Sequence, residues 1–175
     1  NTGKIVQLTQ DIQVYKNTNG SFGIIMVPSD TILDGNGHRL VMKAGYTEAP
    51  DVGVVLYVYK DGVIPSTNCG VKNLSTDIPY VNSINVFSAD NILIENNTFT
   101  NSCGMIASIA HASNITIRNN RFSNTLARKR QMSYRGAIQV INADHIYIVN
   151  NQYQKTEAIP PPAVFYDRKN VKELI

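Results

Sequence analysis

At 175 residues, with 43% hydrophobic and only 17% charged residues, the chain fits a single domain. No stretch approaches the roughly twenty apolar residues of a membrane-spanning helix, which excludes a span of that kind, and no secretory leader is recognisable. The formal net charge of +3 is too mild, averaged over the chain, to indicate a partner by itself.

The two ends of the chain show irregular strand patterns. Residues 1–22 contain IVQLTQDIQV, which predicts an opening strand that caps the first coil of a stack. Residues 23–42 form an early coil around the segment DGNGH, and residues 54–74 hold VVLYVYK followed, after a loop, by VKNL. A last coil opens at PAVFYDRKNVKELI, residues 162–175.

Between these ends, three stretches repeat one another: NILIENNTFTNS at 91–102, NITIRNNRFSNT at 114–125 and HIYIVNNQYQKT at 145–156. Recurrence at this scale indicates a stacked-repeat architecture. The starts of the repeats are 23 and 31 residues apart, which a β-solenoid accommodates because extra residues leave one corner as a loop. Each repeat alternates β-branched and polar residues, then has two Asn and an aromatic residue, a pattern of strand, tight turn and strand. The sequence therefore predicts an all-β protein, a single-stranded parallel β-helix of roughly six coils, with one domain over residues 1–175.

The Asn pairs explain how the chain turns. Asn enters the left-handed backbone region more readily than most residues, and stacked Asn amides can bond to the coils above and below as a ladder. We therefore expect the pairs to form a structural ladder at one corner rather than a ligand site. They are Asn96–Asn97, Asn119–Asn120 and Asn150–Asn151.

The residues before each repeat align as columns. Two apolar columns are expected to point into the solenoid, because strand side chains alternate with period two. One consists of Ile84, Ala107 and Ile138, and the other of Val86, Ile109 and Val140. The residues between the columns, Asn85, Ser108 and Gln139, are then expected to face outward.

Ile175 stops inside a coil, on an apolar strand without a capping element. An uncovered strand edge invites pairing. We expect either that the natural protein continues beyond Ile175 or that another subunit covers this end, and an Asn at position 1 suggests a processed chain or a fragment.

The cysteines and histidines give little indication of a metal site. Cys69 and Cys103 are expected at different corners of adjacent coils, which disfavours a disulfide and favours buried free thiols. There is no CxxC and no His/Cys/carboxylate cluster at ligand spacing, so neither a transition metal nor another cofactor is predicted, and calcium is left open. His38 and His145 are expected to be structural.

One long loop, NTLARKRQMSYRG at 124–136, concentrates positive charge in Arg128, Lys129, Arg130 and Arg135. Such a run is either a solvated surface or a cationic wall beside the outward strands, which Lys60, Lys155, Arg168 and Lys169 would extend. A wall of this kind attracts a polyanion. Nucleic acid is disfavoured because the run lacks interleaved aromatic residues.

The coil pattern NILIENNTF, the DGNGH segment and the Asn corner resemble the right-handed parallel β-helix superfamily. Its members include pectate lyases, polygalacturonases, alginate lyases and epimerases, repeat proteins of periplasmic copper-loading systems, and phage tailspikes. The resemblance covers roughly residues 23–175 and implies saccharide binding along one sheet and its flanking loops. The substrate contacts expected on this basis are Asn85, Ser108, Gln139, Asn142, Lys60, Arg128, Lys129 and Arg130.

The catalytic signatures of these enzymes are mostly missing. Of the polygalacturonase series Asn-Thr-Asp, Asp-Asp, Gly-His-Gly and Arg-Ile-Lys, the chain has only Ser75-Thr76-Asp77, so two-carboxylate hydrolysis lacks carriers. The Asp-Pro-His-Asp of alginate epimerases and the Arg-x-Pro-x-x-Arg of pectate lyases are absent. β-Elimination on a uronate polymer needs a cation and a base. Arg135 could supply the cation, His111 the base and Tyr134 the acid.

Two hypotheses for the function follow. In the first, the chain is a polysaccharide-modifying enzyme, or a piece of one, that acts on an acidic polysaccharide by elimination. In the second, it is a non-catalytic glycan-binding or structural segment, like a tailspike or an adhesin shaft, which would self-associate. Both predict an extracellular, periplasmic or virion-surface location.

Overall fold

The fold was analysed in a computed structural model, which describes most of the chain and, in several strands, the backbone alone. The described residues are 3–15, 25–46, 52–56, 58–60, 62–64, 66–78, 82–100, 107–110, 112–123, 138–141, 143–154 and 164–166.

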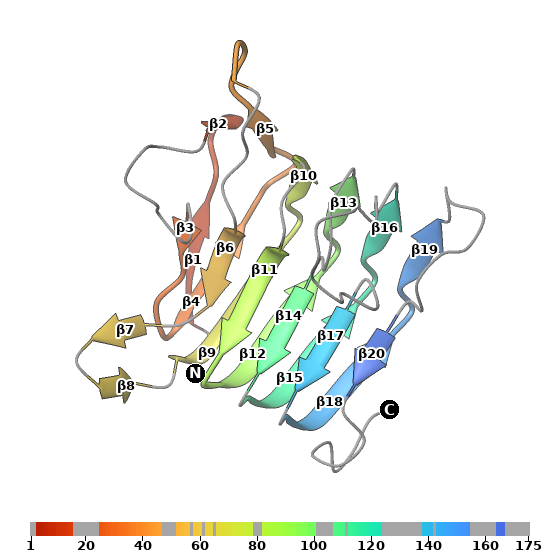
Figure 1. Cartoon of the computed structure of the whole chain (residues 1–175). Coiled ribbons are helices and arrows are strands. Elements are labelled where there is room, and N and C mark those ends of the chain that lie inside the picture. The colour runs from red at the N-terminus through yellow and green to blue at the C-terminus, as the bar shows by residue number, and fades with distance from the viewer. Residues whose placement is uncertain are drawn as a thin grey trace.

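The described residues form three parallel sheets of six strands each and one two-stranded antiparallel sheet (Figure 1). Sheet A contains β1 (Lys4–Gln7), β4 (Thr31–Asp34), β9 (Ser66–Lys72), β12 (Ala89–Glu95), β15 (Ser113–Arg118) and β18 (Asp144–Val149). Sheet B contains β2 (Ile12–Val14), β5 (Arg39–Met42), β10 (Ser75–Asp77), β13 (Thr98–Thr100), β16 (Arg121–Ser123) and β19 (Gln152–Gln154). Sheet C contains β3 (Ile25–Met26), β6 (Val52–Leu56), β11 (Asn82–Phe87), β14 (Ala107–Ala110), β17 (Ile138–Ile141) and β20 (Val164–Tyr166).

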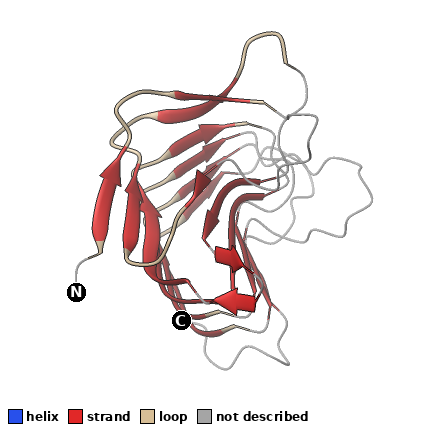
Figure 2. Cartoon of the chain, turned by 90° about the vertical axis from the view of Figure 1, so that its left-hand side faces the viewer, coloured by secondary structure: helices blue, strands red, loops and turns tan. Residues whose placement is uncertain are grey.

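The chain visits the three sheets in turn, so that β9, β10 and β11 form one coil and β12, β13 and β14 form the next. Figure 2 views the stack from its N-terminal side and shows the sheets around one interior. The described residues contain no helix. The parallel β-helix predicted from the repeats is therefore confirmed.

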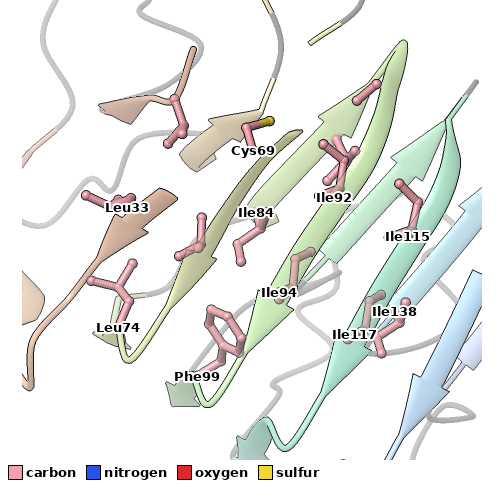
Figure 3. Packing of buried hydrophobic residues seen from close by; sticks show 14 of the residues in the cluster. Leu33, Cys69, Leu74, Ile84, Ile92, Ile94, Phe99, Ile115, Ile117 and Ile138 are labelled. Carbon is pink, nitrogen blue, oxygen red and sulfur yellow. The ribbon is translucent and has the colours of Figure 1, made fainter. Parts of the chain in front are cut away.

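The interior is filled by columns of aliphatic side chains from all three sheets (Figure 3). In sheet A, Ile92 and Ile94 pair with Ile115 and Ile117 of the next strand, and all four are at most 2% exposed. In sheet B, the rings of Phe99 and Phe122 stack with centroids 5.4 Å apart and planes 9° apart. Because each coil contacts only its neighbours, the hydrophobic core is built up coil by coil along the stack.

The Asn ladder lies at the corner between sheets A and B, as the sequence predicts. The first Asn of each pair has a positive φ: 54° at Asn96, 56° at Asn119 and 53° at Asn150. The second Asn of each pair carries the ladder. The Oδ1 atom of Asn120 accepts the backbone N–H of Asn97 at 2.9 Å, and that of Asn151 accepts the backbone N–H of Asn120 at 2.9 Å.

A second row of residues with a left-handed backbone lies where the strands of sheet A begin, and the repeats in the sequence do not indicate it. Asp30, Asn68, Asn91, Asn114 and His145 all have φ between 52° and 56°. The Nδ2 atom of Asn91 donates to Oδ1 of Asn68 at 2.7 Å, and Nδ2 of Asn68 donates to Asp30 at 2.9 Å. This row bends the chain where it enters sheet A.

The first segment of the chain adds strands to two sheets. β1 pairs in parallel with β4, and β2 pairs in parallel with β5. An antiparallel hairpin of β7 (Val58–Lys60) and β8 (Gly62–Ile64) stands between β6 and β9, where the sequence indicated one strand segment, VVLYVYK, followed by a loop.

Candidate functional site

The outer face of sheet C is the candidate site, because the register places the predicted polar residues in one row. Asn85 of β11 pairs with Ser108 of β14, and Ser108 pairs with Gln139 of β17. The flanking positions are in register too, with Ile84 opposite Ala107 and Val86 opposite Ile109. Ile84 and Val86 are fully buried and Asn85 between them is half-buried, so the alternation predicted for β11 is confirmed.

The same row continues at both ends with apolar residues. Asn85 pairs with Val55 of β6, and Val55 pairs with Met26 of β3, whose side chain is 57% exposed. At the other end, Gln139 pairs with Phe165 of β20. The internal repeats do not predict these positions of the row, because the segments that contain them lack the Asn pair on which the repeats were aligned.

The other predicted residues of the site lie outside the described residues or have no described side chain. The predicted site residues that lie outside the described ranges are His111, Tyr134, Arg135, Asn142, Arg128, Lys129 and Arg130. In the sequence, His111 directly follows β14, whereas Tyr134 and Arg135 lie between β16 and β17.

Lys60 ends β7, within the hairpin that follows β6. It thus lies at the end of sheet C at which the strands finish. The predicted basic loop, residues 124–136, lies between β16 and β17 in the sequence and falls outside the described residues.

The outer face of sheet A differs, because four of its charged residues form ion pairs across strands. Asp34, Lys72, Glu95 and Arg118 occupy one row of the register. Nζ of Lys72 lies 3.4 Å from Oδ2 of Asp34, and Nε of Arg118 lies 2.6 Å from Oε1 of Glu95. Opposite charges on neighbouring strands stabilise the pairing of those strands, so we assign this row a structural role.

Asp34 is the most buried carboxylate of that row. Burial raises the pKa of its carboxyl group, but hydrogen bonds from the Asn73 side chain and the Asn36 backbone outweigh this effect. A hydrogen bond from Gln7 and the charge of Lys72 add to them, so the pKa lies below its ordinary value of 3.8. The hydrogen bonds explain how a nearly buried carboxylate stays charged.

The described histidines and cysteine have structural surroundings. Nδ1 of His38 lies 3.5 Å from Oδ1 of Asp11, and Nδ1 of His145 lies 3.3 Å from Oδ1 of Asp144. Cys69 is 1% exposed, and burial raises the pKa of its thiol to about 12, with a smaller contribution from the charge of Asp30, so it is not a nucleophile at neutral pH. In the described part of the chain, no three His, Cys, Asp or Glu residues gather as metal ligands.

A cluster that the sequence did not suggest lies at the N-terminal end of sheet B. The rings of Tyr15 and Tyr46 are 4.7 Å apart between centroids, and both side chains are exposed. Nζ of Lys43 lies 4.8 Å from the Tyr15 ring centroid and 5.2 Å from that of Tyr46. No repeat or motif links these residues, so only the pairing of β2 with β5 brings them together.

Comparisons with known proteins agree with the architecture. A family model described as "Right handed beta helix region" matches residues 54–160. No curated protein sequence matches the chain.

Among solved structures, PfbA, a surface adhesin of Streptococcus pneumoniae, superposes with a TM-score of 0.62 at 14% identity over 93% of this chain. The chain spans 45% of the length of that adhesin. The plasmid-mediated fluoroquinolone resistance protein QnrB1 has a TM-score of only 0.15 at 10% identity, over 95% of this chain and 92% of its own. The match to the adhesin shows a shared fold. Within the described residues, no helix is long and apolar enough to cross a membrane.

Proposed function

The chain belongs to the right-handed β-helix family, and we propose that it binds an acidic polysaccharide along the outer face of sheet C. The observation that carries this proposal is the continuous row across β11, β14 and β17, in which Asn85, Ser108 and Gln139 follow one another in register. Neighbouring strands lie about 4.8 Å apart, so the row offers hydrogen-bonding residues at a regular spacing suited to an extended polymer.

The contrast with sheet A supports the choice of face. Four charged side chains of sheet A form two ion pairs across strands, Asp34 with Lys72 and Glu95 with Arg118. The central positions of the sheet C row are uncharged amides and a hydroxyl, which can bond to sugar hydroxyls. We propose that the basic residues Arg128, Lys129 and Arg130 attract the acidic groups of the polymer and so help to bring the polymer to the row.

We propose a surface or extracellular location. The similarity to a surface adhesin supports it at the level of fold. A role like that of an adhesin requires binding without turnover, and it also suits the sequence, which lacks the short catalytic signatures of β-helix enzymes. Self-association through an end of the stack belongs to this proposal.

Elimination by His111, Arg135 and Tyr134 is the competing function. The similarity in fold to a surface adhesin and the missing catalytic signatures favour binding over elimination as the first hypothesis. Incubation with a panel of uronate polymers, followed by ultraviolet detection of unsaturated products, distinguishes the two. Product that disappears in His111→Ala or Arg135→Ala would replace our proposal with a lyase.

A glycan array probed at low salt tests binding itself. We expect acidic polysaccharides to bind, and added salt to weaken binding because it screens the basic residues. The variant Asn85→Ala/Gln139→Ala is expected to bind more weakly, whereas Gln152→Ala/Gln154→Ala, on the exposed face of sheet B, serves as a matched control. Absence of any acidic ligand, or equal binding by both variants, contradicts the proposal.

A further inference from the structure

A second surface has the chemistry of a ligand site, and it lies on a different sheet from the row described above. Tyr15 directly follows β2, and Lys43 and Tyr46 follow β5 in the segment that rises at the top of Figure 1. Tyr15 is 42% exposed and Tyr46 is 44% exposed, so two large aromatic side chains are open to solvent at one place. Exposed aromatic residues that gather at one place mark interaction sites more often than single ones do.

The backbone holds the cluster in position. The N–H of Lys43 donates to the carbonyl of Val14 at 2.9 Å, which extends the pairing of β2 with β5 by one bond. The N–H of Tyr46 donates to the carbonyl of Lys43 at 3.2 Å, and Gly45 has a φ of 85°, so residues 43–46 form a tight turn. A turn that needs a positive φ at its third residue favours Gly. The two rings are therefore placed by backbone hydrogen bonds rather than by packing in the core.

The two rings are close together but not parallel. The planes of Tyr15 and Tyr46 are tilted by 38° at a centroid distance of 4.7 Å, so the rings form an angled pair rather than a closed stack. Ring faces of this kind contact the apolar face of a ligand, while the tyrosine hydroxyls supply hydrogen bonds at the edge.

The charge of Lys43 selects the class of ligand. Its Nζ lies over both rings, at 4.8 Å and 5.2 Å, in cation–π geometry. Within the described residues, no carboxylate lies in ion-pair distance of Lys43, whereas Lys72 and Arg118 are each paired with one. A cation already at the rings repels a cationic ligand and attracts an anionic one.

We infer that Tyr15, Tyr46 and Lys43 form a separate site for an acidic monosaccharide unit such as a uronic acid. The apolar face of the sugar lies against the tyrosine rings, and its carboxylate pairs with Lys43. This inference does not rest on the sheet C row, because β2 and β5 belong to sheet B and the site needs one sugar unit rather than a polymer.

The test uses the whole chain with sodium glucuronate as the probe and glucose as its neutral counterpart. Chemical shifts of the tyrosine rings are recorded by nuclear magnetic resonance, with Tyr15 and Tyr46 assigned through Tyr15→Phe and Tyr46→Phe. We expect glucuronate to shift the signals of these two rings, and glucose to do so only at higher concentration. Signals from Tyr147, which is also exposed but lies on sheet A, are expected to stay in place.

Variants separate the contributions. Lys43→Met is expected to weaken glucuronate binding roughly two- to fivefold, the usual size of an exposed ion pair, and to leave glucose unchanged. Tyr15→Ala/Tyr46→Ala is expected to weaken both sugars roughly fivefold or more. Lys4→Met, which removes an exposed lysine of β1, is the matched control. Far-ultraviolet circular dichroism confirms that each variant keeps its β structure.

Unchanged tyrosine signals in glucuronate, or glucuronate binding that survives Tyr15→Ala/Tyr46→Ala, overturns the inference. Neither result bears on the sheet C row, whose test uses polymers and the Asn85→Ala/Gln139→Ala variant. Loss of polymer binding in that row variant, with glucuronate shifts intact, would likewise leave the tyrosine site standing.

Discussion

The side chains of Asn97 and Asn120 bond directly to each other inside the corner between sheets A and B, where each is only 1% exposed. Oδ1 of Asn120 accepts both the backbone N–H of Asn97, at 2.9 Å, and its Nδ2, at 3.0 Å. Nδ2 of Asn120 in turn donates to the carbonyl of Ile94 at 3.0 Å. One carboxamide thus satisfies three buried polar groups of the preceding coil, which links neighbouring coils at the turn.

Replacing Asn120 with Ala should destabilise the protein by about 3 kcal/mol, because several buried polar groups lose their partners. Denaturant unfolding measures the free energy of unfolding. Gln152→Ala, on the exposed face of β19, is the control and should change it by less than about 0.5 kcal/mol. Equal stabilities for the two variants would mean that the ladder contributes nothing.

Thr76 of β10 occupies the column position that Phe99 occupies in β13 and Phe122 occupies in β16. Its side chain is 1% exposed, and its Oγ1 is the only buried side-chain polar atom of the described residues that lacks a hydrogen-bond partner. Thr76→Val removes this hydroxyl and keeps the shape, so it should stabilise the fold by about 1 kcal/mol. Thermal unfolding checks this against Thr98→Val, which changes an outer position of β13. A lower melting temperature for Thr76→Val would show that the hydroxyl is bonded in solution.

The depressed pKa of Asp34 predicts how stability depends on pH. A carboxyl group whose pKa is lower in the folded protein stabilises the fold above its ordinary pKa of 3.8, and this stabilisation is lost as the pH falls through the folded value. Unfolding free energies measured from pH 7 down to the acid limit should therefore fall less steeply in Asp34→Asn than in the wild type. Parallel pH profiles for the two proteins would contradict this assignment.

Gly70 fills the position of β9 that lies opposite Leu93 of β12. A Cβ atom at Gly70 would lie 2.4 Å from the carbonyl oxygen of Leu93, a backbone atom that cannot move without displacing the strand. Gly70→Ala should therefore cost about 2 to 3 kcal/mol of stability. Thr116→Ala, which changes the next residue of the same row, should cost less. Equal losses in denaturant unfolding would show that the strand adjusts.

The sequence predicts the features that repeat. The Asn pairs and the columns of Ile84 and Val86 recur in each middle coil, so alignment alone gives their register. The same alignment cannot include Met26 or Phe165, because their coils lack the Asn-pair motif. It also gives no indication of the β7–β8 hairpin, which occurs once.

The Tyr15–Tyr46 contact shows a different limit. These residues come from separate coils and share no motif, and their contact depends on the pairing of β2 with β5 and on the turn at Gly45. Local patterns report on a residue's own strand or turn, so contacts between irregular coils appear only in the structure. The charged row on sheet A belongs to the same class, because Asp34 and Lys72 meet only once β4 and β9 are in register.

Binding of an acidic polysaccharide along the sheet C row is most directly tested by hydrogen–deuterium exchange with and without an oligouronate at saturating concentration. We predict slower amide exchange in β11, β14 and β17, and unchanged exchange in the strands of sheet A. Slower exchange confined to sheets A or B, or no change in any strand at any uronate concentration, would contradict it.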